Sequence, residues 1–553
     1  MICICCKAGM KHCLNTLLCM WYCLVTSVAV ADVPHHSVAD ENSVRLWESG
    51  VFGPQQNQTF LSSDVRAPVF MVHKFELDQT APGSHIYLSF PVGGQLQSPV
   101  ILSARDRSVV YIDPSWNGGG ALDYQPYHSQ NFLTFWTGKG HICWGTGGCI
   151  LLNDHYPIFK NITSNHADFI GADNHEFQLT SDGTALINIF YKVNMSATAV
   201  GGPEDALIHN NAFQEIDIET GEPRFTWIAS DHFTFDESFN EFADDPAIGG
   251  GWDWFHMNSI QKTPGGNYLI SARHLCVLAL ISGEDGRVLW RLGGKHNDFL
   301  DLSGDGSATG FCFQHHARFV TDSWDEITLF DNRAMRSTAA AAAAAAGEQA
   351  CSRALRLRLD LDAMTADLVH GWAHPLGVQA WAQGGVQALP GGGAMIGWGK
   401  VPSFTEFTAA GDTVLEVQLS PWDTAAGGRH GSSVYRVYKH DYKAYPPWGP
   451  SVAVKDGCVY VSWNGATEVD TWEVLRGSDP GNVTSQGVRV PRAGFETAIR
   501  IPQTEDLPVV QIAARDKDGN VLGHAGVVDA RTGDKLSPNI QFRSLERTRL
   551  GPQ

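Results

Sequence analysis

Three histidines stand at the same phase of a repeating sequence pattern. Each lies four residues before an apolar residue that opens a strand-like run. A neutral imidazole is a nucleophile, a general base or a metal ligand, so three at one phase predict a catalytic or binding cluster. A single histidine at the start of a strand is usually structural, and repeats also reuse residues for packing; the shared phase favours the functional interpretation. The histidines are His175, His256 and His315, and the apolar anchors are Leu179, Ile260 and Phe319.

A second phase lies seventeen residues after each histidine, where Lys192, Arg273 and Asn332 stand. An arginine beside neutral imidazoles forms an anion site, because its planar fork matches a sulfonate, phosphate or carboxylate. Three imidazoles also suit zinc. We favour the anion site over a metal, because these segments supply no consistent carboxylate ligand and Arg273 would repel a cation. His316 follows His315 one residue out of phase, so either of the two is a candidate nucleophile.

The segments that carry these residues are short β-branched and aromatic runs separated by Gly, Asp, Asn and Pro. Successive apolar anchors, continued to Val386, are 81, 59 and 67 residues apart. Units of four antiparallel strands at this spacing predict a β-propeller with room for five or six blades. Equivalent positions on successive blades surround one axis, so the three histidines would converge at one end of the central channel. The clearest helical candidate is the stretch around 350–359.

The predicted fold class is all-β, with four parts. Residues 1–31 have basic Lys7 and Lys11, an apolar run and an Ala-Val-Ala exit, as in a cleaved secretory signal; an uncleaved anchor is the alternative. Residues 32–445 form the propeller. Residues 446–530, with short strands and a buried-Trp candidate, suit an Ig/fibronectin-like β-sandwich. Residues 531–553 form a flexible tail, and the alanine run at 339–346 is a loop insertion.

The composition excludes several classes of protein. The chain is 43% hydrophobic with 17 Trp and 27 Phe, which argues against disorder. Its net charge of −20 argues against a nucleic-acid or anionic-membrane binder. We find no phosphate-binding loop and no Gly-x-Ser-x-Gly elbow. Cys143 and Cys149 are spaced to close a small disulfide loop. Four Asn-x-Ser/Thr sequons begin at Asn57, Asn161, Asn194 and Asn482 and would carry glycans in a eukaryotic secretory pathway.

The segments 173–186, 252–260, 266–273, 289–295 and 313–319 together resemble the arylsulfotransferase family that works without phosphoadenosine phosphosulfate, most closely its secreted fungal branch. The similarity runs from about residue 85 to 445. It implies a six-bladed propeller with the active site at the channel centre. It also implies transfer of a sulfuryl group from a phenolic sulfate donor to a phenol acceptor, with no cofactor, no nucleic acid and no membrane partner.

Matched position by position, the resemblance makes His315 the histidine that becomes sulfated, with His316 still open as the nucleophile. His175 and His256 resemble the supporting histidines, and Arg273 resembles the anion-holding arginine. The chain departs from the bacterial enzymes, whose small β domain is N-terminal rather than C-terminal. Two alternatives stay open: a secreted propeller that binds an anionic or aromatic ligand without turnover, and a sulfatase-like hydrolase. The donor, the acceptor and the oligomeric state are not specified by the sequence.

Overall fold

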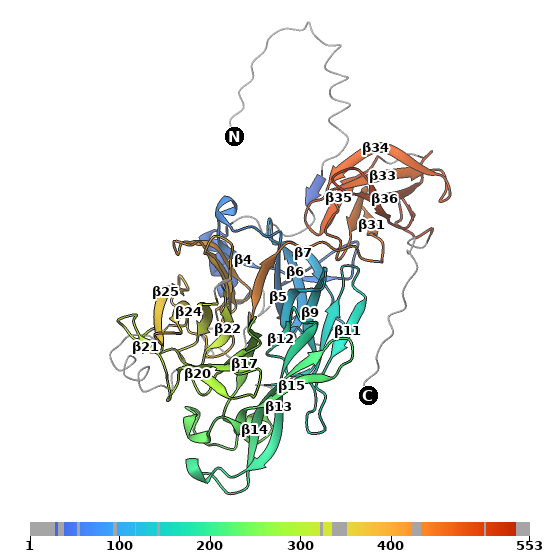
Figure 1. The fold of residues 1–553 in the computed structure, drawn as a ribbon. Coiled ribbons are helices and arrows are strands. Elements are labelled where there is room, and N and C mark those ends of the chain that lie inside the picture. Colours follow the sequence, from blue (N-terminus) through green and yellow to red (C-terminus); the bar gives the residue numbers. More distant parts are fainter. Residues whose placement is uncertain are drawn as a thin grey trace, which may run out of the picture. The chain divides into compact units, whose positions relative to one another are not determined.

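The computed structural model describes residues 28–30, 38–51, 56–91, 97–116, 118–140, 144–320, 324–333, 351–422, 433–502 and 505–537. Most of the predicted signal, the alanine run at 339–346 and the end of the predicted tail lie outside these residues. The chain divides into a larger unit, residues 35–58 and 66–444, and a smaller one, residues 1–34, 59–65 and 445–553. Figure 1 shows that strands dominate both. The all-β prediction is therefore confirmed.

Six sheets of four or five strands make up most of the described part of the larger unit. The first contains β5 (His85–Pro91), β6 (Gln97–Ser103), β7 (Val109–Ile112) and β30 (Val437–His440). The second contains β8 (Gly120–Tyr127), β9 (Gln130–Gly140), β10 (Gly145–Leu152) and β11 (Ile158–Ile162). The third contains β12 (Phe177–Leu179), β13 (Thr184–Met195), β14 (Ala206–Asp217), β15 (Pro223–Ile228) and β16 (Trp252–Asp253).

The other three sheets follow in chain order. The fourth contains β17 (Met257–Lys262), β18 (Tyr268–Ala272), β19 (Val277–Ile281) and β20 (Val288–Gly293). The fifth contains β21 (Leu300–Asp301), β22 (His315–Phe319), β23 (Glu326–Asp331), β24 (Arg353–Asp360) and β25 (Thr365–Ala373). The sixth contains β26 (Gly385–Ala388), β27 (Ala394–Gly397), β28 (Ser403–Phe407), β29 (Thr413–Gln418) and β4 (Met71–Phe75).

Contacts between these sheets run in a cycle. Each sheet contacts the next one along the chain, as in β13 with β17 and β17 with β22, and the sixth sheet contacts the first through β26 and β30. The ends of the unit are tied together twice, because β30 pairs with β5 and β29 pairs with β4. Hydrophobic side chains fill the space between neighbouring sheets: Ile208 and Phe213 pack with Ile260 and Ile270. Burying a side chain of this size stabilises the fold by about 1.5–3 kcal/mol.

The repeat found in the sequence corresponds to one position in these sheets. The four apolar anchors lie on β12, β17, β22 and β26, each the strand at one edge of its sheet, and all four are buried. A glycine stands in the turn of each of three hairpins. These are Gly221 between β14 and β15, Gly286 between β19 and β20, and Gly411 between β28 and β29. At the first of these Gly221 has φ +77°, a left-handed conformation that favours glycine. The repeat phase therefore identified the strands by which neighbouring sheets contact each other.

The smaller unit contains two sheets with one shared core. Val459, Ile499, Trp472 and Ile512 come from both sheets and belong to a single hydrophobic cluster. One sheet orders β1 (Val28–Val30), β35 (Glu496–Arg500), β32 (Cys458–Ser462) and β31 (Ser451–Lys455). The other contains β34 (Val483–Pro491), β33 (Thr471–Gly477), β36 (Val509–Arg515), β37 (Val521–His524) and β38 (Val528–Asp529).

The remaining described elements are short. Among the described residues, the one α-helix is α2 (Glu41–Glu48), and no helix is long and apolar enough to cross a membrane. The chain passes between the units near β2 (Asn57–Thr59) and β3 (Arg66–Pro68). Five single-turn 3₁₀ segments complete the set: Leu77–Gln79, Thr198–Val200, Ala229–Asp231, Phe235–Glu237 and Pro246–Ile248.

The helix predicted around 350–359 is wrong. Residues 353–360 form the strand β24, in which Leu355, Leu357 and Leu359 are buried. Arg356 and Arg358 alternate with these leucines and both bind Glu326 on β23. The apolar residues therefore repeat every two positions, the period of a strand, and pairing with β23 and β25 outweighs the helical preference of Ala, Leu and Arg.

The cysteine pairing predicted from spacing is also wrong. Cys149 is a free thiol on β10, fully buried in the core between the second and third sheets, while Cys143 lies outside the described residues. The disulfide joins Cys276 and Cys312, which are 36 residues apart. Closeness in the sequence did not predict the pairing. The strand β10 places Cys149 in the core, and contacts between the fourth and fifth sheets bring Cys276 and Cys312 together.

Candidate active site

The structure brings three of the predicted histidines into one cluster. His175 precedes β12, His256 precedes β17 and His315 begins β22. The ring centres of His175 and His256 are 4.9 Å apart, and those of His256 and His315 are 6.5 Å apart. All three side chains are at least nine-tenths buried. Arg273, in the turn between β18 and β19, is half-buried, and its backbone N–H donates to the His256 carbonyl at 3.0 Å.

Irregular backbone aims these side chains. The pairing register shifts at the start of both β17 and β22, and such bulges redirect side chains beside active sites. His256 and His316 have φ +56° and +55°, and Gln383 has φ +63°. Left-handed conformations are uncommon for residues other than glycine and cluster at functional sites.

Amide side chains fix the backbone next to the histidines. Asn188 donates to the Met257 carbonyl at 2.9 Å, and Asn258 donates to the Gln314 carbonyl at 2.8 Å. The Gln314 amide in turn donates to Ala272 and Val277 carbonyls of the fourth sheet. These amides tie the third, fourth and fifth sheets together beside His256 and His315.

An acceptor oxygen behind each histidine determines its tautomer. His175 Nδ1 lies 2.6 Å from Asp173 Oδ1, and His256 Nδ1 lies 2.5 Å from Asp253 Oδ2. A carboxylate only accepts, so Nδ1 carries the proton in both rings and Nε2 carries the lone pair. The two carboxylates also stabilise any positive charge that develops on these rings.

The partner of His315 is a neutral amide instead. Asn332 Nδ2 donates to the carbonyls of Ala380 and Gln383, at 2.8 and 2.9 Å, which leaves Asn332 Oδ1 to face His315 Nδ1 at 2.7 Å. His315 therefore also carries its proton on Nδ1. Its Nε2 lone pair accepts the backbone N–H of Gln383 at 3.2 Å.

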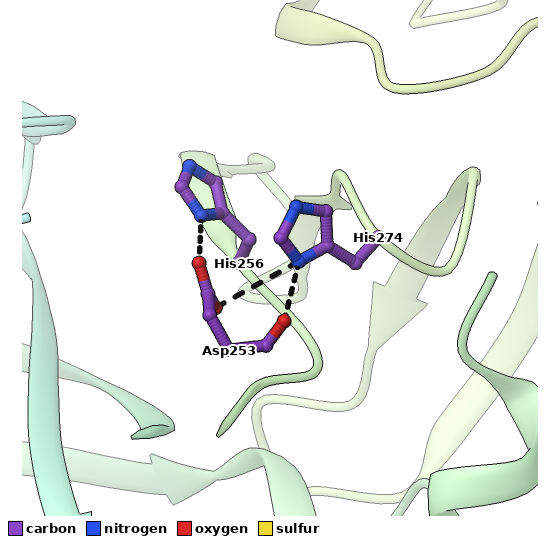
Figure 2. Close-up of side chains that lie close together, drawn as sticks. All are labelled: Asp253, His256 and His274. Atoms are coloured by element: carbon purple, nitrogen blue, oxygen red, sulfur yellow. Dashed lines mark hydrogen bonds and ion pairs between the residues drawn. The ribbon is translucent and has the colours of Figure 1, made fainter. Parts of the chain in front are cut away.

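Asp253 connects two imidazoles, as Figure 2 shows. Its carboxylate binds His256 and lies 3.8 Å from His274 Nδ1, while its carbonyl accepts from His274 Nδ1 at 2.6 Å. The ligand atoms of Asp253, His256 and His274 lie within 4.8 Å of one another, close enough to hold a metal ion. These atoms already bind one another, and Arg273 Nη1 is hydrogen-bonded to His274 Nε2. The group therefore fits an orienting role for Asp253 better than a cation site.

Burial keeps these imidazoles neutral. It lowers the pKa of His256 and His315 well below the usual value of 6.5, and the positive charge of Arg273 lowers both pKa values further. Burial likewise lowers the pKa of His274. At neutral pH His256, His274 and His315 are therefore uncharged beside the Arg273 guanidinium, which is the group that suits an anion.

His316 lies apart from this cluster in its contacts. Its Nδ1 accepts the Val386 N–H at 3.1 Å, and its Nε2 meets the Tyr438 hydroxyl at 2.8 Å. Both ring nitrogens are therefore engaged, one with β26 and the other with β30. His316 thus connects β22 to these two strands.

Several residues that the sequence analysis missed also line the cluster. The Tyr435 ring lies 5.9 Å from His175 and 5.8 Å from His315. Arg436 donates to the His175 carbonyl at 2.6 Å and pairs with buried Glu176. Asp173 and Asp253 were detectable as acids two or three residues before a repeat histidine. Tyr435 carried no such signal, because it lies just before the strand that returns to close the first sheet.

The Cys276–Cys312 disulfide joins the segments that carry Arg273 and His315. Cys276 closes the turn that carries Arg273 and His274, and Cys312 lies three residues before His315. The covalent bond therefore restricts movement of the arginine turn relative to His315.

Comparisons with known proteins identify the family. The model of the arylsulfotransferase (ASST) family matches residues 124–420, more than half of the chain. No curated protein sequence matches significantly. Among solved structures, a protein of unknown function from Bacteroides caccae is similar at 14% identity, over 64% of this chain and 100% of that one, with a TM-score of 0.35. A putative 6-phosphogluconolactonase from Bacteroides fragilis is similar at 12% identity, over 75% and 98%, with a TM-score of 0.30. On the match over residues 124–420, this chain belongs to the arylsulfotransferase family.

Proposed function

We propose that this protein transfers a sulfuryl group from a phenolic sulfate ester to a phenol through a sulfohistidine at His315. The observation that carries this proposal is the difference in partners: His315 faces a neutral amide, whereas His175 and His256 face carboxylates. A neutral partner favours a nucleophile that stays uncharged, and a carboxylate partner favours a base that accepts a proton.

In the first step, His315 Nε2 attacks sulfur, the N–S bond forms, and the bond from sulfur to the aryl oxygen breaks. The phenolate leaves with the bonding electrons. Attack replaces the 3.2 Å hydrogen bond from Gln383, whose N–H is then available to a sulfonate oxygen. Because Nδ1 keeps its proton, the sulfated ring is cationic, which makes it a good sulfuryl donor.

In the second step, the acceptor phenol attacks sulfur and the N–S bond breaks. His175 or His256 takes the phenol's proton, with its charge balanced by Asp173 or Asp253. We assign Arg273, whose positive charge acts on both His256 and His315, to the sulfonate oxygens in both steps. Removal of one such preorganised donor typically costs about 3–4 kcal/mol. No step requires a cofactor.

We further propose that the six sheets are the blades of a six-bladed β-propeller, because their contacts run in a closed cycle. The two sheets of the smaller unit, with Trp472 in their shared core, suit an Ig/fibronectin-like sandwich. Secretion after signal cleavage is supported by a disulfide and by exposed asparagines in all four sequons. Membership of the fungal branch stays a prediction from the sequence motifs.

The test uses 4-nitrophenyl sulfate with and without phenol. We expect nitrophenolate release that depends on phenol and falls at least about 10³-fold in His315→Ala. His316→Gln is the matched control and should keep transfer if it folds. Intact-protein mass spectrometry without acceptor should detect one added sulfuryl group in the wild type and none in His315→Ala. Release without phenol would instead indicate a hydrolase, and full activity in His315→Ala would overturn the assigned nucleophile.

A further inference from the structure

A pocket adjoins the histidine cluster and has no assigned ligand. Its volume is about 190 Å³, and Phe190, Tyr191 and Lys192 of β13 form one wall. The Phe190 ring lies 5.7 Å from His175 and 5.4 Å from His256, so one residue of the pocket lining contacts both of those imidazoles. The lining residues are Trp144, Asp168, Ile170, Phe190, Tyr191, Lys192 and His209.

The size and lining suit a single aromatic ring. A cavity of about 150 Å³ holds benzene, whereas sites for whole drug-sized ligands begin near about 300 Å³. The pocket is therefore large enough for one substituted ring. Trp144, Phe190 and Tyr191 contribute aromatic side chains to the lining, together with Ile170, which is exposed. Rings pack well against such faces.

The charged groups of the pocket favour an acidic substituent on that ring. Within the described parts of the chain, the Lys192 ammonium makes one hydrogen bond, to the Gly249 carbonyl at 2.6 Å, and no ion pair. An ammonium has three donors, so two remain for a ligand. Asp168 also lines the pocket, and its carboxylate lies 3.6 Å from His166 Nδ1. His209 Nε2 is engaged by the Gly250 carbonyl at 2.8 Å.

The position of the pocket favours the acceptor rather than the donor. Phe190 contacts His175 and His256, the two carboxylate-backed bases, and an acceptor phenol must give its proton to a base. His209 lies directly opposite Asp253 in the pairing of β14 with β16, so the pocket wall also adjoins the group that orients His256.

We propose that this pocket binds a monocyclic acceptor phenol that carries a carboxylate, with the ring among Trp144, Phe190 and Tyr191 and the carboxylate on Lys192. This inference rests on the proposed sulfuryl transfer and names its acceptor class. In this arrangement the phenol hydroxyl lies at the Phe190 end of the pocket, the side nearer His175 and His256, and the carboxylate lies at Lys192, whose side chain is exposed.

The experiment compares 4-hydroxybenzoate, phenol and 4-(aminomethyl)phenol as acceptors from 4-nitrophenyl sulfate. We expect the wild type to have the highest kcat/KM with 4-hydroxybenzoate. Lys192→Gln should lower the ratio of kcat/KM for 4-hydroxybenzoate to that for phenol about tenfold, the effect of losing one charge-assisted hydrogen bond. Asp168→Asn should raise this ratio. Lys455→Gln, at an exposed lysine of the smaller unit, is the matched control and should leave it unchanged.

Binding without turnover separates this inference from the proposed function. Calorimetric titration of the full chain with 4-hydroxybenzoate should give a Kd that rises about tenfold in Lys192→Gln, with an unchanged thermal midpoint. Transfer to phenol combined with an unchanged acceptor ratio in Lys192→Gln would overturn the pocket assignment alone. Preference for the aminomethyl acceptor would also overturn it, in favour of Asp168. If no acceptor is sulfated, the proposed function fails, and the titration still decides whether the pocket binds a phenolic acid through Lys192.

Discussion

His315 donates its Nδ1 proton to Asn332 at 2.7 Å, and Asn332 is itself held by the carbonyls of Ala380 and Gln383. Since the amide nitrogen is committed to these carbonyls, the amide oxygen must face the imidazole. The arrangement specifies both the tautomer and the neutral charge of the proposed nucleophile. The other two repeat histidines have the same tautomer but anionic partners, so one repeated position supplies two kinds of chemistry.

Asn332→Asp should change the pH dependence of transfer. A carboxylate beside His315 stabilises the imidazolium and raises the pKa of His315, so the acid side of the activity profile should move to higher pH. The profile of kcat/KM between about pH 5 and pH 9 measures this shift. Asn332→Ala, which removes the partner without adding charge, is the comparison and should lower kcat without such a move. An identical profile in the wild type and Asn332→Asp would show that this contact does not control the nucleophile.

Asp253→Asn tests the orienting role of the carboxylate between His256 and His274. The amide keeps the shape of the side chain but no longer stabilises positive charge on His256. We expect kcat to fall about 10²-fold, about 3 kcal/mol, with a smaller change in KM. Asp182→Asn, at an exposed turn, is the control.

Treatment with a chelator tests the alternative that Asp253, His256 and His274 hold a metal ion. Because the ligand atoms of Asp253, His256 and His274 bind one another, prolonged treatment with EDTA should leave transfer unchanged. Loss of activity with EDTA, restored by a divalent metal, would show that these residues form a metal centre.

The sequence predicted the histidine cluster because the repeat places the three histidines at equivalent positions of three sheets. His175, His256 and His315 each lie where the edge strand of a sheet begins, and these edge strands contact the neighbouring sheets, so phase alone brought the three histidines together. The seventeen-residue offset also identified Arg273, Asn332 and Lys192, although it gave Asn332 and Lys192 no role.

Contacts that depend on pairing between distant strands could not be predicted. Tyr435 reaches His175 and His315 only because β30 returns to pair with β5. The Cys276–Cys312 disulfide likewise depends on contacts between distant segments, since it joins turns of two successive sheets. The stretch at 353–360 contains good helix formers, and only its pairing with β23 and β25 makes it a strand.

Loss of the disulfide should reduce both stability and catalysis. A cross-link that closes a loop of 36 residues stabilises the folded state by about 4 kcal/mol in the chain-entropy model. We expect the double variant Cys276→Ser, Cys312→Ser to have a lower thermal midpoint and a lower kcat, because the turn with Arg273 is no longer tied to the segment before His315. Cys149→Ala is the control for loss of a buried cysteine outside the site. Wild-type kcat in the double variant would mean that packing alone positions Arg273.

Stability should fall as the pH drops below 6.5, and His374 should account for a measurable part of the fall. Burial lowers the pKa of His374 to about 4, while the unfolded chain keeps the ordinary value of 6.5. Between these values the unfolded state binds a proton that the folded state does not, so the free energy of unfolding decreases as the pH falls from 6.5 towards 4. The full loss of unfolding free energy from this group is about 3 kcal/mol.

Chemical denaturation at a series of pH values should give a shallower decrease in the free energy of unfolding for His374→Gln than for the wild type. The Gln amide can still bond Leu376 and Ser403. His155→Gln, at an exposed site, should follow the wild type, and equal slopes in all three proteins would contradict the assigned role of His374.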